Sequence, residues 1–312
     1  MTLDLRHTFE WTAARDPNDE TVGDVTERVG LDGVGDRQPA AVLLGEPYDG
    51  GIVGRPGARE GPRYLREQLS TTKTHHFDAG PVGAVVDLGD VAVRGRFDGN
   101  YRDATSTVQD RIADVTRRVH ALDALPVFLG GDNSLTCANV RPLLDDGDDV
   151  GVVSFDAHLD CREPIGEPSS GTPYRQLFEA GLDHLSVVGA RHFETSTAYH
   201  DYLREREGTV VTSEECADPV AAAERALPDV DRLYVSVDLD VLENAAAPGV
   251  SAPTPGGVST RELFRMLRFV AGDDRLVGLE VVECSPRHDE GNRTARAGAR
   301  AVAHALAGAG PA

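Results

Sequence analysis

Short apolar runs alternate with segments of helical periodicity along most of the chain. Runs that are apolar at nearly every position are typical of strands buried on both faces of a parallel sheet. This pattern predicts strands at 39–45, 84–87, 126–129, 150–155, 185–189, 209–211, 233–238 and 276–282. Apolar residues at helical spacing predict a helix that begins at residue 61 and further helices at 103–122, 174–180, 219–226, 259–270 and 295–307.

The order of these elements indicates the fold class. Strands and helices alternate from residue 39 onward without a linker-like break. Such alternation predicts an α/β protein of three-layer α/β/α architecture, in which helices cover both faces of a mostly parallel sheet. Residues 1–38 are polar, acidic and rich in turn residues. We therefore expect an amino-terminal arm with little core, followed by a single domain over 39–312.

Acidic side chains follow the predicted strand at 150–155 directly. Asp156, His158 and Asp160 are spaced two apart. If the backbone stays extended past the strand, these side chains point to one side, because the side-chain period of a strand is two. Two carboxylates and an imidazole in one place repel and desolvate one another unless a cation lies between them, and this donor set suits Mn²⁺, Fe²⁺ or Zn²⁺. The alternative is a solvated acidic loop.

A second strand, 233–238, ends in the same way with Asp238 and Asp240. In a parallel sheet both acidic clusters emerge at the carboxyl ends of strands, where α/β proteins bind their ligands. Five candidate ligands from two strand ends are enough for two metal ions that share bridging carboxylates. One metal ion would need fewer.

Charge and cysteine content narrow the choice of partners and compartment. The formal net charge is −21, and Lys73 is the single lysine among 31 basic residues. A polyanion repels nucleic acid and anionic membranes, so we expect neither as a partner, and the near-absence of lysine indicates adaptation to a high-salt cytoplasm. The four cysteines form no CxxC pair, and no run is long enough to span a membrane. These features predict a soluble cytoplasmic protein that acts on a small molecule.

Several motifs together resemble a known family, the ureohydrolases (arginase, agmatinase and formimidoylglutamase). They are the segments 130–134 (GGDNS), 156–160 (DAHLD), 236–240 (SVDLD) and 280–283 (EVVE), which occur in the order of that family. The combination is more specific than any single motif. The resemblance implies the three-layer fold, a binuclear manganese site, hydrolysis of a C–N bond in a guanidino or amidino group, and assembly into homotrimers or hexamers.

The resemblance also implies a ligand for each metal ion. Asp156 and Asp238 bridge the two ions in that reading, Asp160 completes one, and His158 and Asp240 complete the other. The family usually has a histidine where this chain has Asn133. An amide oxygen binds Mn²⁺ more weakly than imidazole does, so we expect a weakened first metal site. The alternative is that Asn133 only caps a turn.

Two further residues bear on the substrate. Ser170 stands in the segment Ser-Gly-Thr-Pro, where arginase and agmatinase carry a proton-shuttling histidine, and Arg162 follows the first cluster. Formimidoylglutamases are similar to this chain in both features. Arginine repels the cations arginine and agmatine but binds carboxylates bidentately, and N-formimino-L-glutamate carries two of them. The alternative is that Arg162 pairs with surface acids.

The resemblance therefore predicts hydrolysis of N-formimino-L-glutamate to L-glutamate and formamide by a metal-bridging hydroxide. Asp160 is expected to hold the hydroxide and to pass its proton to the leaving nitrogen, and Glu283 to bind the amidinium NH groups. Two alternatives remain open at this stage. One is an agmatinase or another guanidino hydrolase. The other is a non-catalytic relative that serves as a binding subunit, for which Asn133 and Ser170 are the supporting features.

Overall fold

The computed structural model describes residues 5–93 and 103–310. Its main sheet is 10-stranded, in the order β1-β6-β3-β7-β12-β11-β8-β9-β10, with β2 also paired to β6. The strands are β1 (Leu5–Arg6), β2 (Thr26–Arg28), β3 (Ala41–Gly45), β6 (Val85–Val91), β7 (Leu125–Leu129), β8 (Val150–Phe155), β9 (His184–Ala190), β10 (Thr209–Thr212), β11 (Arg232–Asp238) and β12 (Leu276–Val282). A separate two-stranded sheet pairs β4 (His75–His76) with β5 (Gly80–Pro81).

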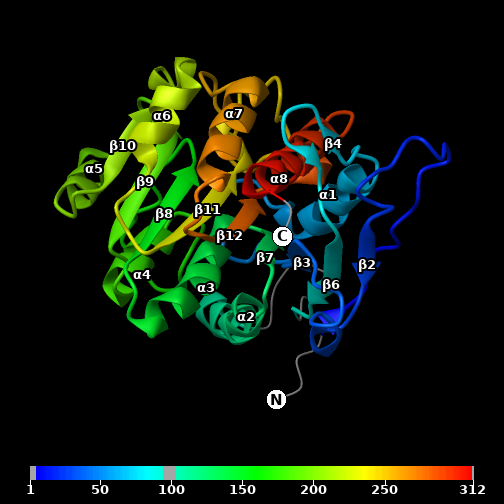
Figure 1. The fold of residues 1–312 in the computed structure, drawn as a ribbon. Coiled ribbons are helices and arrows are strands. Elements are labelled where there is room, and N and C mark those ends of the chain that lie inside the picture. The colour runs from blue at the N-terminus through cyan, green and yellow to red at the C-terminus, as the bar shows by residue number, and fades with distance from the viewer. Residues whose placement is uncertain (1–4, 94–102, 311–312) are drawn as a thin grey trace.

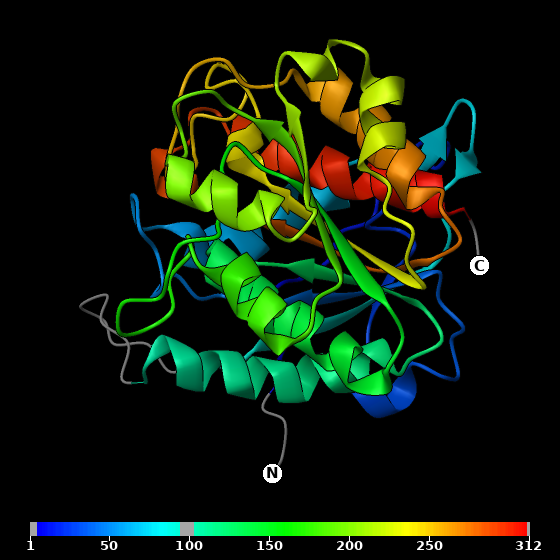
Figure 2. The ribbon, with the colours of Figure 1, turned by 90° about the vertical axis from the view of Figure 1, so that its left-hand side faces the viewer.

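Helices cover both faces of the main sheet (Figure 1). They are α1 (Gly61–Ser70), α2 (Thr105–His120), α3 (Thr136–Val140), α4 (Pro173–Ala180), α5 (Thr197–Arg204), α6 (Pro219–Ala226), α7 (Thr260–Ala271) and α8 (Arg293–Ala309). One hydrophobic core contains residues of α1, α6, α7 and α8, and a second contains residues of α2 to α5. In Figure 2 α2 lies on the opposite side of the sheet from α7 and α8. The predicted three-layer α/β/α architecture is confirmed.

The sheet is mostly parallel, as predicted. Among the described pairs within it, only β1 with β6 is antiparallel. Parallel strands buried on both faces account for the near-continuous apolar runs, and every residue of β3, β6 and β8 is buried. The carboxyl ends of neighbouring strands consequently lie along one edge of the sheet.

The amino-terminal segment adds strands to one side of the sheet. β1 and β2 both pair with β6, and the Trp11 indole donates a hydrogen bond to Asp87 over 2.8 Å. Val22 and Val34 are buried, so the segment contributes to the core at positions where the sequence predicted little core. A boundary at residue 38 stays a prediction. Within the described ranges, no helix combines the length and apolar character that a membrane span requires.

Candidate active site

The predicted metal ligands and Glu283 lie at the carboxyl ends of four adjacent strands, β7, β12, β11 and β8. Asn133 begins the turn after β7, Glu283 follows β12, Asp238 ends β11 and Asp156 follows β8. These strands are neighbours in space although their ends are far apart in the sequence: the Asn133 backbone NH donates to Glu283 Oε1 over 2.9 Å, across 150 residues. The parallel register of the sheet therefore assembles the site.

Two groups of possible metal ligands share one residue. Asp156, His158 and Asp240 form the first group, and Asp156, Asp160 and Asp238 form the second; within each group the candidate ligand atoms lie within 4.8 Å of one another. Asp156 is fully buried, and its Oδ2 has no hydrogen-bond partner among the described residues. A buried carboxylate oxygen without a partner is costly, and a cation between the two groups would satisfy it. The residues present thus fit a metal centre.

Tight turns, rather than an extended strand, bring these side chains together. β8 ends at Phe155, and Asp160 has a φ of 42°, in the left-handed region. Asp156 Oδ1 accepts a hydrogen bond of 2.7 Å from the His158 backbone NH, and Asp238 Oδ1 accepts one of 2.8 Å from that of Asp240. The condition of an extended backbone past the strand is not met, because each aspartate folds the chain back by accepting a hydrogen bond from the NH two residues on.

Burial and mutual repulsion raise the pKa values of several of these carboxyl groups. Burial raises the pKa of Asp156 to about 6, and it raises the pKa values of Asp160 and Asp238 well above the usual range. Burial would lower the pKa of His158, but the charges of Asp240 and Asp156 raise it to about 12. His158 Nδ1 lies 3.1 Å from Asp240 Oδ2. The acidic cluster therefore favours positive charge at the position that His158 occupies.

Asn133 is buried at the edge of this cluster. Its Nδ2 donates to Asp160 Oδ2 over 2.6 Å. The following turn is capped by Asp132, whose side chain accepts a hydrogen bond from the Ser134 backbone NH. The capping role considered for Asn133 therefore belongs to its neighbour, and the Asn133 side chain is left facing the acidic cluster.

Glu283 is buried beside Asn133, and its φ of 65° is also in the left-handed region. Its Oε2 has no hydrogen-bond partner among the described residues. Burial raises the pKa of this carboxyl well above its usual value. The side chain lines a small cavity of about 90 Å³ together with His158, Asp160, Arg162, Ser170, Asp238 and Asp240. An acceptor without a partner that faces this cavity is suited to bind the NH groups of a ligand.

Arg162 lies where this cavity meets a second hollow of about 410 Å³. Its side chain crosses Gly171, where a Cβ would lie 2.7 Å from Arg162 Cδ. Within residues 5–93 and 103–310 no carboxylate is within ion-pair distance of it, so the alternative of pairing with surface acids is not supported. Two other arginines near the site have structural partners: Arg175 Nε donates to Cys161 O, and Arg191 donates to four oxygens of Thr254, Asp240 and Leu242.

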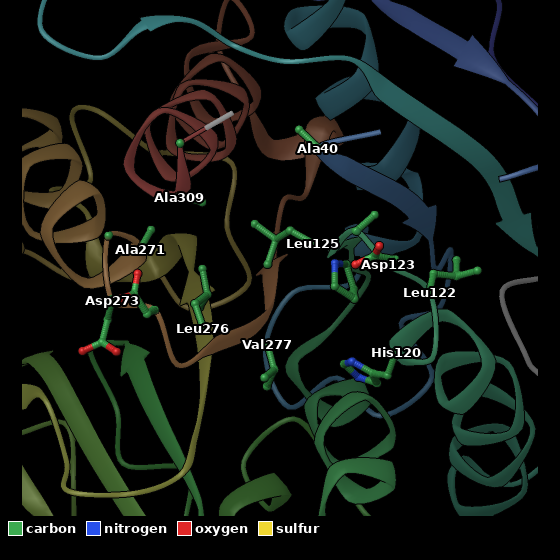
Figure 3. A pocket seen from close by; sticks show the side chains of 15 residues that line it. Ala40, His120, Leu122, Asp123, Leu125, Ala271, Asp273, Leu276, Val277 and Ala309 are labelled. Atoms are coloured by element: carbon green, nitrogen blue, oxygen red, sulfur yellow. The ribbon is translucent and has the colours of Figure 1, made fainter. Parts of the chain in front are cut away.

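The sequence did not indicate the other residues that line the second hollow, the one of about 410 Å³. Phe193, Glu194 and Tyr199 line it, and Glu194 Oε2 lies 3.6 Å from His158 Nε2. They belong to a polar segment before and within α5 that matches no motif. A larger pocket of about 430 Å³ lies at the opposite edge of the sheet, where β3, β7 and β12 begin (Figure 3). It contains none of the predicted ligands.

Fold and site together define an α/β protein of three layers with a candidate metal centre at the carboxyl edge of its sheet. The chain belongs to the arginase family, whose sequence profile matches residues 39–308. It is 54% identical to a formimidoylglutamase of Halobacterium salinarum, over 98% of this chain and 99% of that one. The structure resembles the crystal structure of Bacillus subtilis formimidoylglutamase, with a TM-score of 0.85, 26% identity, and coverage of 98% and 96% of the two chains. It also resembles Trypanosoma cruzi formiminoglutamase crystallised with Mn²⁺, with a TM-score of 0.77, 25% identity, and coverage of 90% and 98%.

Proposed function

We propose that this protein is an enzyme that hydrolyses N-formimino-L-glutamate to L-glutamate and formamide, a reaction of histidine degradation. The observation that carries the proposal is the free guanidinium of Arg162 beside the acidic cluster. It is suited to an anionic substrate such as this dicarboxylate and disfavours the cations agmatine and arginine. The relatives named formimidoylglutamase support the same substrate.

Two Mn²⁺ ions are the proposed cofactors. Asp156 and Asp238 would bridge them, with Asp160 and the weaker ligand Asn133 on one ion. His158 and Asp240 would hold the other. The division of these residues into two groups that share Asp156 supports this arrangement, as does the manganese in the related crystal structure. Bound divalent cations supply a nucleophile at neutral pH, because they lower the pKa of the water that coordinates them.

The side chains of the site have separate tasks in the proposed reaction. Water adds its oxygen to the formimino carbon, and the bond from that carbon to the glutamate nitrogen breaks. Asp160 takes the proton released by the water and passes it to the leaving nitrogen. Glu283 Oε2 accepts hydrogen bonds from the amidinium, and Arg162 binds a substrate carboxylate. Ser170 Oγ accepts from the Val53 backbone NH over 3.1 Å, which leaves the hydroxyl proton of Ser170 for the substrate.

The proposal also covers the cellular location and the oligomeric state of the enzyme. We place it in the cytoplasm of a cell with high internal salt, because the chain combines a net charge of −21 with a single lysine. We also propose a homo-oligomer, a trimer or hexamer, on the resemblance to the family. The four cysteines are free and buried, which suits a reducing compartment.

A substrate panel tests the function. Protein loaded with manganese in molar KCl is incubated with formiminoglutamate, agmatine and arginine, and formamide, urea and glutamate are quantified. We expect formamide and glutamate in equal amounts from the first substrate and no urea from the other two. Urea release without formamide would reassign the protein to the guanidino hydrolases. Absence of turnover with every substrate would favour the non-catalytic relative.

A further inference from the structure

Thr136 presents a buried hydroxyl between Asn133 and Glu280. Its Oγ1 lies 2.6 Å from Asn133 Oδ1 and 2.6 Å from Glu280 Oε1. Thr136 and Glu280 are fully buried and Asn133 is 1% exposed, so bulk water does not reach these contacts. The other end of the Asn133 amide contacts Asp160. The amide therefore lies between the hydroxyl and the candidate metal centre.

The protons available to Thr136 limit how this amide can be oriented. A threonine hydroxyl has one proton and donates to one acceptor. With the amide oxygen toward Thr136, both of its neighbours are acceptors, and one of the contacts of 2.6 Å joins two oxygens without a proton. Glu280 is an acceptor in its other contacts too, because the Asn139 amide donates to it over 2.8 Å and the Tyr234 hydroxyl over 3.1 Å.

Exchange of the oxygen and nitrogen of the amide removes the conflict at Thr136. Nδ2 of Asn133 then donates to Thr136, and Thr136 donates to Glu280. The two ends of an amide have nearly the same size, so the exchange leaves the packing unchanged. The oxygen of Asn133 then takes the place of Nδ2 in the 2.6 Å contact with Asp160 Oδ2. Two acceptor oxygens face each other there, an arrangement that a cation bound by both would satisfy.

We propose that Thr136, held in turn by Glu280, is a positioning residue that turns the amide oxygen of Asn133 toward the metal centre. Hard divalent cations bind carbonyl oxygens, whereas an amide NH₂ group has only donors to offer. Asparagine has a single oxygen, so the orientation of the amide determines whether Asn133 is a ligand at all. This inference rests on the proposed metal centre and adds a residue that controls one of its ligands.

The test is a titration with Mn²⁺ alone, in which free Mn²⁺ is followed by electron paramagnetic resonance in the absence of substrate. Thr136→Val removes the hydroxyl at constant shape, and we expect the affinity of the weaker site to fall by about tenfold or more. Thr136→Ser keeps the hydroxyl and should restore most of the affinity. Thr116→Val is the matched control, because it removes another buried hydroxyl, which bonds Ala138 O over 3.0 Å, and should leave affinity unchanged.

The same substitutions made in the Asn133→Asp variant distinguish an effect on the orientation of the amide from an effect on packing. Asn133→Asp supplies a carboxylate with two equivalent oxygens, so one of them faces the metal whatever Thr136 does. Thr136→Val should therefore have little effect in that background. Equal losses in both backgrounds, or wild-type affinity in Thr136→Val, would overturn the proposal. Thermal unfolding is recorded for each variant, and Thr136→Ala replaces Thr136→Val if the latter does not fold.

The outcome is separable from that of the proposed function. No substrate is present, so a wrong substrate assignment leaves the titration unaffected. A wild-type protein that binds no Mn²⁺ would overturn the metal centre and this inference together. A wild-type protein that binds Mn²⁺ with an affinity that Thr136→Val does not change would overturn this inference alone.

Discussion

At the scale of single residues, the surroundings of Arg162 suit a role in substrate binding rather than a role in stabilising the fold. It packs across Gly171 and has no acidic partner among the residues described. Arg162 is exposed in the free protein, and bound substrate would bury its ion pair with the substrate carboxylate. Arg162→Ala should therefore raise the KM for formiminoglutamate by about tenfold or more, since truncation of one member of a buried charge pair costs about 2–5 kcal/mol and each ~1.4 kcal/mol is a factor of ten. Arg162→Lys should recover part of the loss, because an ammonium group lacks the two-pronged fork.

Steady-state kinetics and metal analysis of the same samples check this prediction. Manganese content should stay at the wild-type level in both variants. Near-normal KM values would show that Arg162 is a surface charge that does not bind the substrate. Metal loss in Arg162→Ala would instead assign the residue to the support of the ligands, and the specificity argument would no longer hold.

The residue scale also marks the limit of what the sequence predicts. Asp156, His158 and Asp160 follow a strand in an obvious pattern, and the structure does bring them together. The positive φ values of Asp160 and Glu283 are not visible in that pattern, because nothing local favours a left-handed backbone at an aspartate or a glutamate strongly enough to predict it. The contacts of Asn133 with Glu283 and of Thr136 with Glu280 depend on how β7 and β12 pair, which a single sequence does not reveal.

At the scale of elements, a buried ion-pair cluster joins α1 to β6. The Arg66 side chain is fully buried and bonds Asp87 at 2.8 and 3.0 Å and Asp90 at 2.6 Å. Arg66→Ala leaves two carboxylates without their cation and should lower the free energy of unfolding by about 3–5 kcal/mol. Denaturant unfolding at constant KCl measures it. The control is Arg63→Ala, an exposed position of the same helix, where we expect a change within about 0.5 kcal/mol. Similar losses at both positions would contradict the role of burial.

Periodicity found the long elements of this fold and missed the short ones. The predicted strands and helices appear with boundaries shifted by a few residues; for example, the helix predicted at 103–122 is α2 (Thr105–His120). α5 was not predicted, because Tyr202 and Leu203 are its buried residues and the rest of its sequence is polar. α3 was missed for a different reason: it is entirely buried, so its five residues show no amphipathic pattern.

At the scale of the whole molecule, the net charge of −21 sets the conditions for stability. Repulsion among carboxylates destabilises the compact state in dilute buffer, whereas near 1 M salt the screening length shortens to about 3 Å. The melting temperature and the activity should both rise as KCl is increased from dilute to molar concentration. Calorimetry and initial rates over a KCl series measure the two quantities. Equal stability and activity at both extremes would show that the acidic surface is not an adaptation to salt.

The position of β12 in the sheet has a consequence for how the protein folds during its synthesis. Among the described strands β12 is the last in sequence order, yet it lies between β7 and β11, in the middle of the strand order. While β12 is still inside the ribosome, β7 and β11 each have an unpaired edge at the position that β12 will fill. Unpaired strand edges can pair with strands of other chains. β12 also joins β7, which leads to Asn133, to β11, which carries Asp238. The ligands that follow β8 and β11 can meet as soon as those two strands pair, whereas Asn133 joins them only after β12 has closed the sheet.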